Sequence, residues 1–161
     1  MEKEKKTIDK SSIRFTIMAI VLIAIFCFSI APVTLQNDTF YTIKIGEHVL
    51  KNGIDMKDPF SWHENLEYTY PHWLYDVGIY LIYNIGGQLG IYISTIVLSI
   101  ILGITMYLVN TKLTKNKLTS FILTIGAMYL LKDYIAARAQ LVTFILFILT
   151  VYFIEMFLET K

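Results

Sequence analysis

The sequence has little of what marks most soluble protein classes. Of its 161 residues, one is cysteine, three are proline and eight are glycine, and the net charge is only +1. One cysteine excludes a disulfide scaffold, and the low proline and glycine content excludes a collagen-like chain. The near-zero charge excludes a basic nucleic-acid binder, so no nucleic-acid partner is expected. The glycine-rich nucleotide loops, the GxSxG and HExxH motifs and paired CxxC motifs are also absent.

Hydrophobic residues are abundant instead, at 55% of the chain, and they gather in long runs. A helix needs about 20 apolar residues to cross about 30 Å of hydrocarbon. Runs at 15–35, 89–109 and 141–158 meet this requirement, and a run from 118 reaches 137 if Lys132 extends toward the membrane surface. The sequence therefore predicts one all-α membrane domain over 1–161, a polytopic bundle of four transmembrane helices in a lipid bilayer.

The basic residues predict the orientation of this bundle. Five lie in the tail 1–14 and three in the short segment 110–117, whereas the long segment 36–88 holds three lysines against seven acidic residues. Because basic residues concentrate on the cytoplasmic side, both termini are expected in the cytoplasm of a multi-pass cell-membrane protein. The acidic segment 36–88 then forms a large outer loop.

A cleaved signal peptide is the alternative interpretation of the first run. Ser29-Ile30-Ala31 has the small-x-small pattern of a cleavage site after an apolar stretch. Pro32 directly after the cut is a poor context for cleavage, which favours a retained helix that ends near this proline.

The outer loop is too aromatic for a disordered segment. Its first part predicts an amphipathic helix capped by Asp38 or Thr39 and ended by Asn52-Gly53. The expected apolar face holds Tyr41, Ile43, Ile45, Val49 and Leu50. A second, interfacial helix is expected over 73–85, ended by Gly86-Gly87. Together these predict two interfacial helices within the outer loop.

Several polar residues at the membrane boundary could carry chemistry. Asp38 follows the first run closely, where a carboxylate could serve as a general base or a metal ligand, or simply as a helix cap. Asp58 precedes Pro59 and most simply belongs to a turn. His72 and Asp76 lie four residues apart, so a helix brings them to one face, where the acid could orient the imidazole or the two could simply pack.

A second polar group precedes the last run. Lys132, Asp133 and Arg138 lie at the outer ends of two runs, where basic side chains suit a phosphate or simply extend to the interface. The loop aromatics could stack on sugar rings or form an interfacial aromatic belt. Neither pattern decides between the two interpretations.

A set of short motifs in fixed order gives the chain a resemblance to a known family. It resembles the N-terminal region of GT-C-type multi-pass membrane glycosyltransferases, similar to dolichyl-phosphate-mannose and oligosaccharyltransferase-like enzymes. The resemblance extends from Phe15 to Glu155, and its motifs are Asp38-Thr39-Phe40-Tyr41, Gly46, His48-Val49-Leu50, Gly53, Asp58-Pro59-Phe60-Ser61, His72-Trp73-Leu74, Tyr80, Tyr83, Gly86-Gly87, Gly90 and Arg138-Ala139-Gln140.

The resemblance implies roles for particular residues. Asp38 matches a catalytic aspartate that activates or positions the acceptor while a sugar leaves a polyprenyl-phosphate donor. Asp133 matches a second carboxylate and Arg138 a phosphate contact. The candidate catalytic residue is therefore Asp38. The candidate substrate-binding residues are Asp58, His72, Asp133 and Arg138. Some members of the family use a divalent metal and others do not, so the cofactor stays open.

Family enzymes have more spans than the four expected here. The chain is therefore expected to be a truncated or split form of such an enzyme that works with a second membrane subunit. One alternative is a non-catalytic assembly or scaffold subunit. A small transporter is less favoured, because transport sites place ionisable residues in mid-membrane and the apolar runs have none deep inside.

Overall fold

The computed structural model describes residues 10–32, 35–63 and 66–160, and within them every long element is a helix. Their order is α1 (Lys10–Ser29), α2 (Asn37–Asn52), α3 (Trp73–Thr114), α4 (Lys117–Leu130), the 3-10 turn η1 (Lys132–Tyr134) and α5 (Gln140–Glu159). Three of these, α1, α3 and α5, are long and apolar enough to cross a membrane. The predicted all-helical class is therefore confirmed for the described residues, and three of the helices have the length and apolar composition that a membrane span requires.

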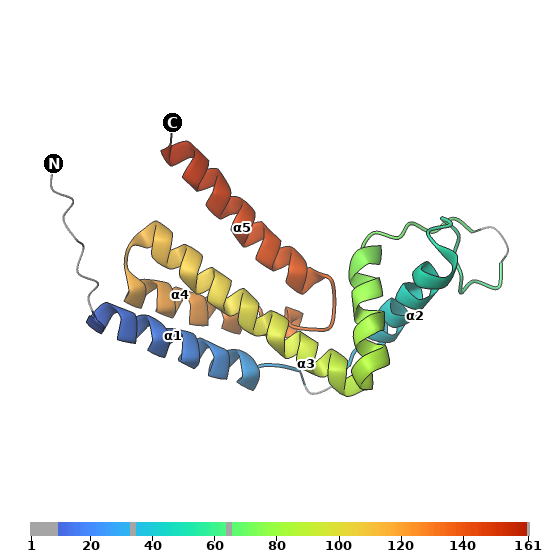
Figure 1. Cartoon of the computed structure of the whole chain (residues 1–161), viewed down its shortest axis with the longest axis horizontal. Helices are drawn as coiled ribbons and strands as arrows, with labels where there is room; N and C mark the ends of the chain where they lie inside the picture. The colour runs from blue at the N-terminus through green and yellow to red at the C-terminus, as the bar shows by residue number, and fades with distance from the viewer. Residues whose placement is uncertain (1–9, 33–34, 64–65, 161) are drawn as a thin grey trace.

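Helix α3 organises the molecule because it contacts α1, α2, α4 and α5. It bends at Gly87, where φ is +57° and ψ is −145°, values that an L side chain rarely adopts. The part before the bend packs beside α2, and the part after it runs along α1 and α4 (Figure 1). The expected helix end at Gly86-Gly87 is thus a sharp bend between two helical segments.

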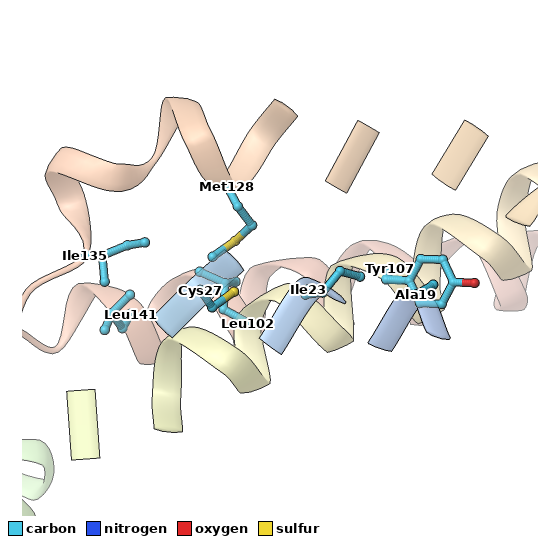
Figure 2. Close-up of a cluster of buried hydrophobic side chains, with 8 residues drawn as sticks. All are labelled: Ala19, Ile23, Cys27, Leu102, Tyr107, Met128, Ile135 and Leu141. Atoms are coloured by element: carbon cyan, nitrogen blue, oxygen red, sulfur yellow. The ribbon is translucent and has the colours of Figure 1, made fainter. Parts of the chain in front are cut away.

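The part of α3 after the bend forms a bundle with α1 and α4. Eight buried residues form the core of this bundle and of the turn into α5: Ala19, Ile23, Cys27, Leu102, Tyr107, Met128, Ile135 and Leu141 (Figure 2). At one end of the bundle, Lys117 Nζ donates to the Ser12 carbonyl oxygen at 2.7 Å and to Thr16 Oγ1 at 2.7 Å. The start of α1 and the turn between α3 and α4 therefore lie together.

Helix α4 is shorter than the predicted run to 137. It ends at Leu130, and its 14 residues span about 21 Å, which is less than the hydrocarbon thickness. The exposed Lys132 and Asp133 enter the 3-10 turn η1, and the chain becomes buried again at Ile135, Ala136 and Ala137 before α5 begins. The expected single helix over 118–137 is thus a shorter helix followed by a 3-10 turn and the buried, non-helical segment 135–137.

Helix α5 packs against α3 but buries little of its own surface. Leu141, in its first turn, is its one fully buried residue. The helix then leans away from α1 and α4, and its end points toward the end of the molecule where α1 begins (Figure 1). Most of its apolar surface is exposed.

Helix α2 packs on the first part of α3 at the opposite end of the molecule from the start of α1 (Figure 1). It ends at Asn52, with Gly53 at φ +79°, as the sequence predicts. Its N-cap is Gln36, so the expectation that Asp38 or Thr39 caps the helix is wrong. Of the expected apolar face, Ile43 and Ile45 are buried, whereas Tyr41 and Leu50 are exposed. Thr39, Thr42 and Gly46 are also buried against the molecule.

Gly46 sets how closely α2 and α3 approach. A Cβ at this position would lie 2.1 Å from the Asp76 carbonyl oxygen and 2.9 Å from Tyr80 Cβ. No side chain fits there without moving the α3 backbone, so glycine is required. We call the unit formed by α2, the segment 53–72 and the first part of α3, 73–86, the cap.

Candidate functional site

A cleft of about 350 Å³ lies where the cap meets the start of α5. Its lining comes from three places in the sequence: Asp38, Tyr41 and Thr42 of α2, Tyr68 and His72 before α3, and Arg138, Ala139 and Gln140 at the entry to α5. Three of the predicted site residues, Asp38, His72 and Arg138, therefore share one cleft. Two of them are separated by 100 positions in the chain.

An ion pair joins two of these residues across the cleft. Arg138 donates from Nη2 to Asp38 Oδ2 at 2.5 Å, and the two side chains stay 44% and 66% exposed. Asp38 is free for this contact because it lies in the first turn of α2 without capping it. There its charge also interacts favourably with the helix dipole.

His72 contacts a second carboxylate at the edge of the same cleft. Its Nδ1 lies 2.8 Å and 2.9 Å from the two carboxylate oxygens of Asp76, one turn into α3. The Asp76 side chain is 1% exposed, whereas that of His72 is 42% exposed. Burial raises the pKa of the Asp76 carboxyl, and the hydrogen bond from His72 partly opposes this rise. The shared helical face predicted from the sequence thus holds a hydrogen-bonded dyad.

Tyrosine rings form one wall of the cleft. Tyr68 packs edge-on against Tyr41, with ring centroids 6.3 Å apart, and against Tyr70, at 4.9 Å. Desolvation raises the pKa of the Tyr41 hydroxyl well above its ordinary value, so it stays protonated and can donate a hydrogen bond. An aromatic wall beside charged groups suits a ligand with both a ring face and polar substituents.

The other two predicted site residues lie outside this lining. Asp58 Oδ1 accepts from the Phe60 amide at 2.9 Å, which is the geometry of a turn-closing aspartate. Asp133 is exposed in η1. Within the described part of the chain, no group of three His, Cys, Asp or Glu side chains could hold a metal ion, so the cleft does not fit a metal held by protein ligands alone.

Two features of the site escape sequence reasoning. The pairing of Asp38 with Arg138 depends on the chain entering α5 beside the cap, which no local pattern encodes. The close approach at Gly46 has a faint signal, a lone glycine inside an amphipathic helix, which often marks tight packing.

Comparison of the chain with protein families, with curated proteins and with solved structures gives no match. The resemblance to GT-C-type enzymes therefore depends on the quoted motifs alone. What the site does must be argued from its geometry.

Proposed function

We propose that this chain is the sugar-transfer module of a GT-C-type membrane glycosyltransferase, using a polyprenyl-phosphate donor at the outer face of the cell membrane. The observation that carries the proposal is the convergence of Asp38, His72 and Arg138 on one cleft. A carboxylate, an imidazole and a guanidinium are suited to orient a hydroxyl, take its proton and hold a departing phosphate.

An apolar groove beside the cleft supports a lipid-linked donor. This groove, of about 290 Å³, lies between the two parts of α3 and the start of α5, and Tyr75, Ile82, Leu98 and Val142 are among its lining residues. Tyr75 precedes Asp76 of the dyad, and Val142 follows Gln140 of the cleft by two positions. A ligand with a phosphate head in the cleft and an isoprenoid chain in the groove would match both.

We propose four membrane crossings, by α1, the part of α3 after Gly87, the α4–η1 region and α5. The lysine-rich segment 110–117, which joins the end of α3 to the start of α4, lies with the start of α1, and this supports a common cytoplasmic side for both. The cap is then on the outer side. Retention of α1 is supported by its three core residues, Ala19, Ile23 and Cys27, which cleavage after Ala31 would remove.

In this proposal, Arg138 binds the donor phosphate, and Asp38 positions the acceptor through its carboxylate. The measurement is transfer from a polyprenyl-phosphate sugar by the purified chain in liposomes. Asp38→Asn should abolish transfer, and Arg138→Gln should mainly weaken the use of the donor. Asp55→Asn, which changes a cap carboxylate outside the cleft lining, is the matched control and should stay active. Equal transfer by wild type and Asp38→Asn, or no transfer by wild type, would refute the proposal.

A non-catalytic assembly subunit is the second candidate, and the exposed surface of α5 favours it. With only Leu141 fully buried, this helix has apolar surface for another membrane subunit. The Asp38–Arg138 pair would then fasten α2 to the entry of α5. In that case Asp38→Ala would change the melting temperature or co-purification with a partner, and no transfer activity would accompany either protein.

A further inference from the structure

We propose that His72 is the proton acceptor of the cleft and that Asp76 is the positioning residue that fixes its ring. This inference rests on the proposed sugar-transfer function for its chemical role. The arrangement of the two side chains can be tested without that function.

The geometry around an ionised Asp76 points to Nδ1 as the protonated nitrogen of His72. An ionised carboxylate only accepts hydrogen bonds, so Nδ1, at 2.8 Å and 2.9 Å from its oxygens, must be the donor. A neutral ring then keeps its lone pair on Nε2. Because His72 lines the cleft and its side chain is 42% exposed, that nitrogen remains for a ligand.

The packing of the cap keeps this arrangement rigid. Asp76 is fully buried, and its main-chain carbonyl is the atom that a Cβ at Gly46 would strike. Helix α2 therefore presses on the turn of α3 that holds the carboxylate. A buried acid that orients a more exposed imidazole is the arrangement that makes histidine an effective general base.

Asp38 is less suited than His72 to take the proton. One of its oxygens already accepts a hydrogen bond from the Arg138 guanidinium at 2.5 Å, which fixes the position of this carboxylate. This leaves Asp38 to orient the acceptor and His72 to deprotonate it.

The proposed step balances in atoms and charge. The acceptor O–H bond breaks, and its proton moves to His72 Nε2. The acceptor oxygen bonds to the anomeric carbon of the sugar as the bond from that carbon to the phosphate oxygen breaks. The electron pair leaves with the phosphate, whose charge Arg138 holds, and the imidazolium then loses its proton to water.

The molecule contains a matched control with the opposite geometry. His48 Nε2 lies 3.3 Å from Asp55 Oδ2, and its Nδ1 lies 3.0 Å from the amide nitrogen of Asn52. The carboxylate of Asp55 is 39% exposed, unlike that of Asp76. His48 should therefore carry its proton on Nε2, and His72 should carry it on Nδ1.

The first measurement is the ¹⁵N spectrum of the full chain labelled at histidine, in detergent micelles, with signals assigned through His48→Gln and His63→Gln. We expect the Nδ1–H form for neutral His72 and the Nε2–H form for neutral His48. Asp76→Leu removes the acceptor of the Nδ1–H bond, so it should move neutral His72 toward the Nε2–H form and leave His48 unchanged. An Nε2–H form for His72 in the wild type, or an unchanged Nδ1–H form in Asp76→Leu, would overturn the proposal.

The second measurement is transfer by the same proteins. His72→Gln and Asp76→Leu should each lower the rate by about 100- to 10,000-fold with the folded state intact, as judged by melting. Asp55→Asn should keep the wild-type rate. If the tautomers are as expected but His72→Gln transfers sugar at the wild-type rate, the role of His72 as proton acceptor is also overturned. Expected tautomers with no transfer by wild type would refute the proposed function alone and leave the dyad established.

Discussion

The helices within the cap and the helices within the bundle pack through different kinds of contact. In the cap, α2 approaches the α3 backbone itself at Gly46, where a Cβ would lie 2.1 Å from a carbonyl oxygen. In the bundle, the corresponding close approach is at Gly103, and a Cβ there would meet side-chain atoms, Ile23 Cγ2 at 2.8 Å and Cys27 Sγ at 2.9 Å. Side chains can shift and a helix backbone cannot, so the cap should tolerate change far less than the bundle.

The largest effect is expected at Gly46. Gly46→Ala must push α2 away from the carbonyl of Asp76 and should cost about 3 kcal/mol, the upper end for overpacking. Thermal unfolding in detergent measures this loss. Gly78→Ala, in the same cap but with open space around its Cβ, is the control and should be neutral or slightly stabilising. Equal melting temperatures for the two variants would show that the close approach is absent.

A smaller effect is expected at Gly103. Gly103→Ala should cost about 1 kcal/mol, because Ile23 and Cys27 can move by a few tenths of an ångström and alanine favours the helix. The double variant Gly103→Ala/Cys27→Ala removes the sulfur and should recover part of the loss, measured by the same unfolding. A loss as large as that of Gly46→Ala would erase the distinction between the two regions.

The buried acid gives the stability of the cap a pH dependence. Because burial raises the pKa of Asp76 in the folded state, its contribution to stability is fully present below the ordinary aspartate pKa and is lost as pH rises through the raised value. The stability of wild type relative to Asp76→Asn should therefore be greatest in acid and shrink toward neutral pH. Melting curves from pH 4 to 7 test this, and a difference that grows with pH would contradict it.

The smallest effect is expected from the ion pair across the cleft. Both Asp38 and Arg138 are exposed, so their coupling in a double-mutant cycle of Asp38→Asn and Arg138→Gln should be about 0.2–1 kcal/mol. The pair thus contributes little to stability, and a large loss of transfer in either single variant would reflect function. A coupling of several kcal/mol would instead favour the assembly-subunit role.

Local patterns predict much of the fold. Apolar run length identifies α1 and α5, and Gly53 and Gly87 mark a helix end and a bend by their backbone requirements. The end of α4 at Leu130 is harder to predict from the sequence, because the run from 118 is apolar up to Lys132. The chain leaves the helix there, and residues 135–137 are then buried in the tertiary structure.

The candidate site was partly predictable for the same reason. His72 and Asp76 are one turn apart, so their contact is local and the sequence indicates it. Asp38 and Arg138 meet only because the chain enters α5 beside the cap. The exposure of Tyr41 and Leu50 follows from the way α2 packs on α3, through its threonines and Gly46. Such long-range contacts depend on the tertiary arrangement, which periodicity does not contain.

The central claim is that the cap, with its cleft, faces the outside of the cell. The start of α1 and the turn between α3 and α4 then face the cytoplasm. The most direct test is labelling of single cysteines with a membrane-impermeant maleimide on intact cells, in a Cys27→Ser background. We predict that Met56→Cys, in the cap, reacts in intact cells and that Lys115→Cys reacts only after the membrane is opened. Reaction at position 115 with protection of position 56 would invert the topology and contradict the account.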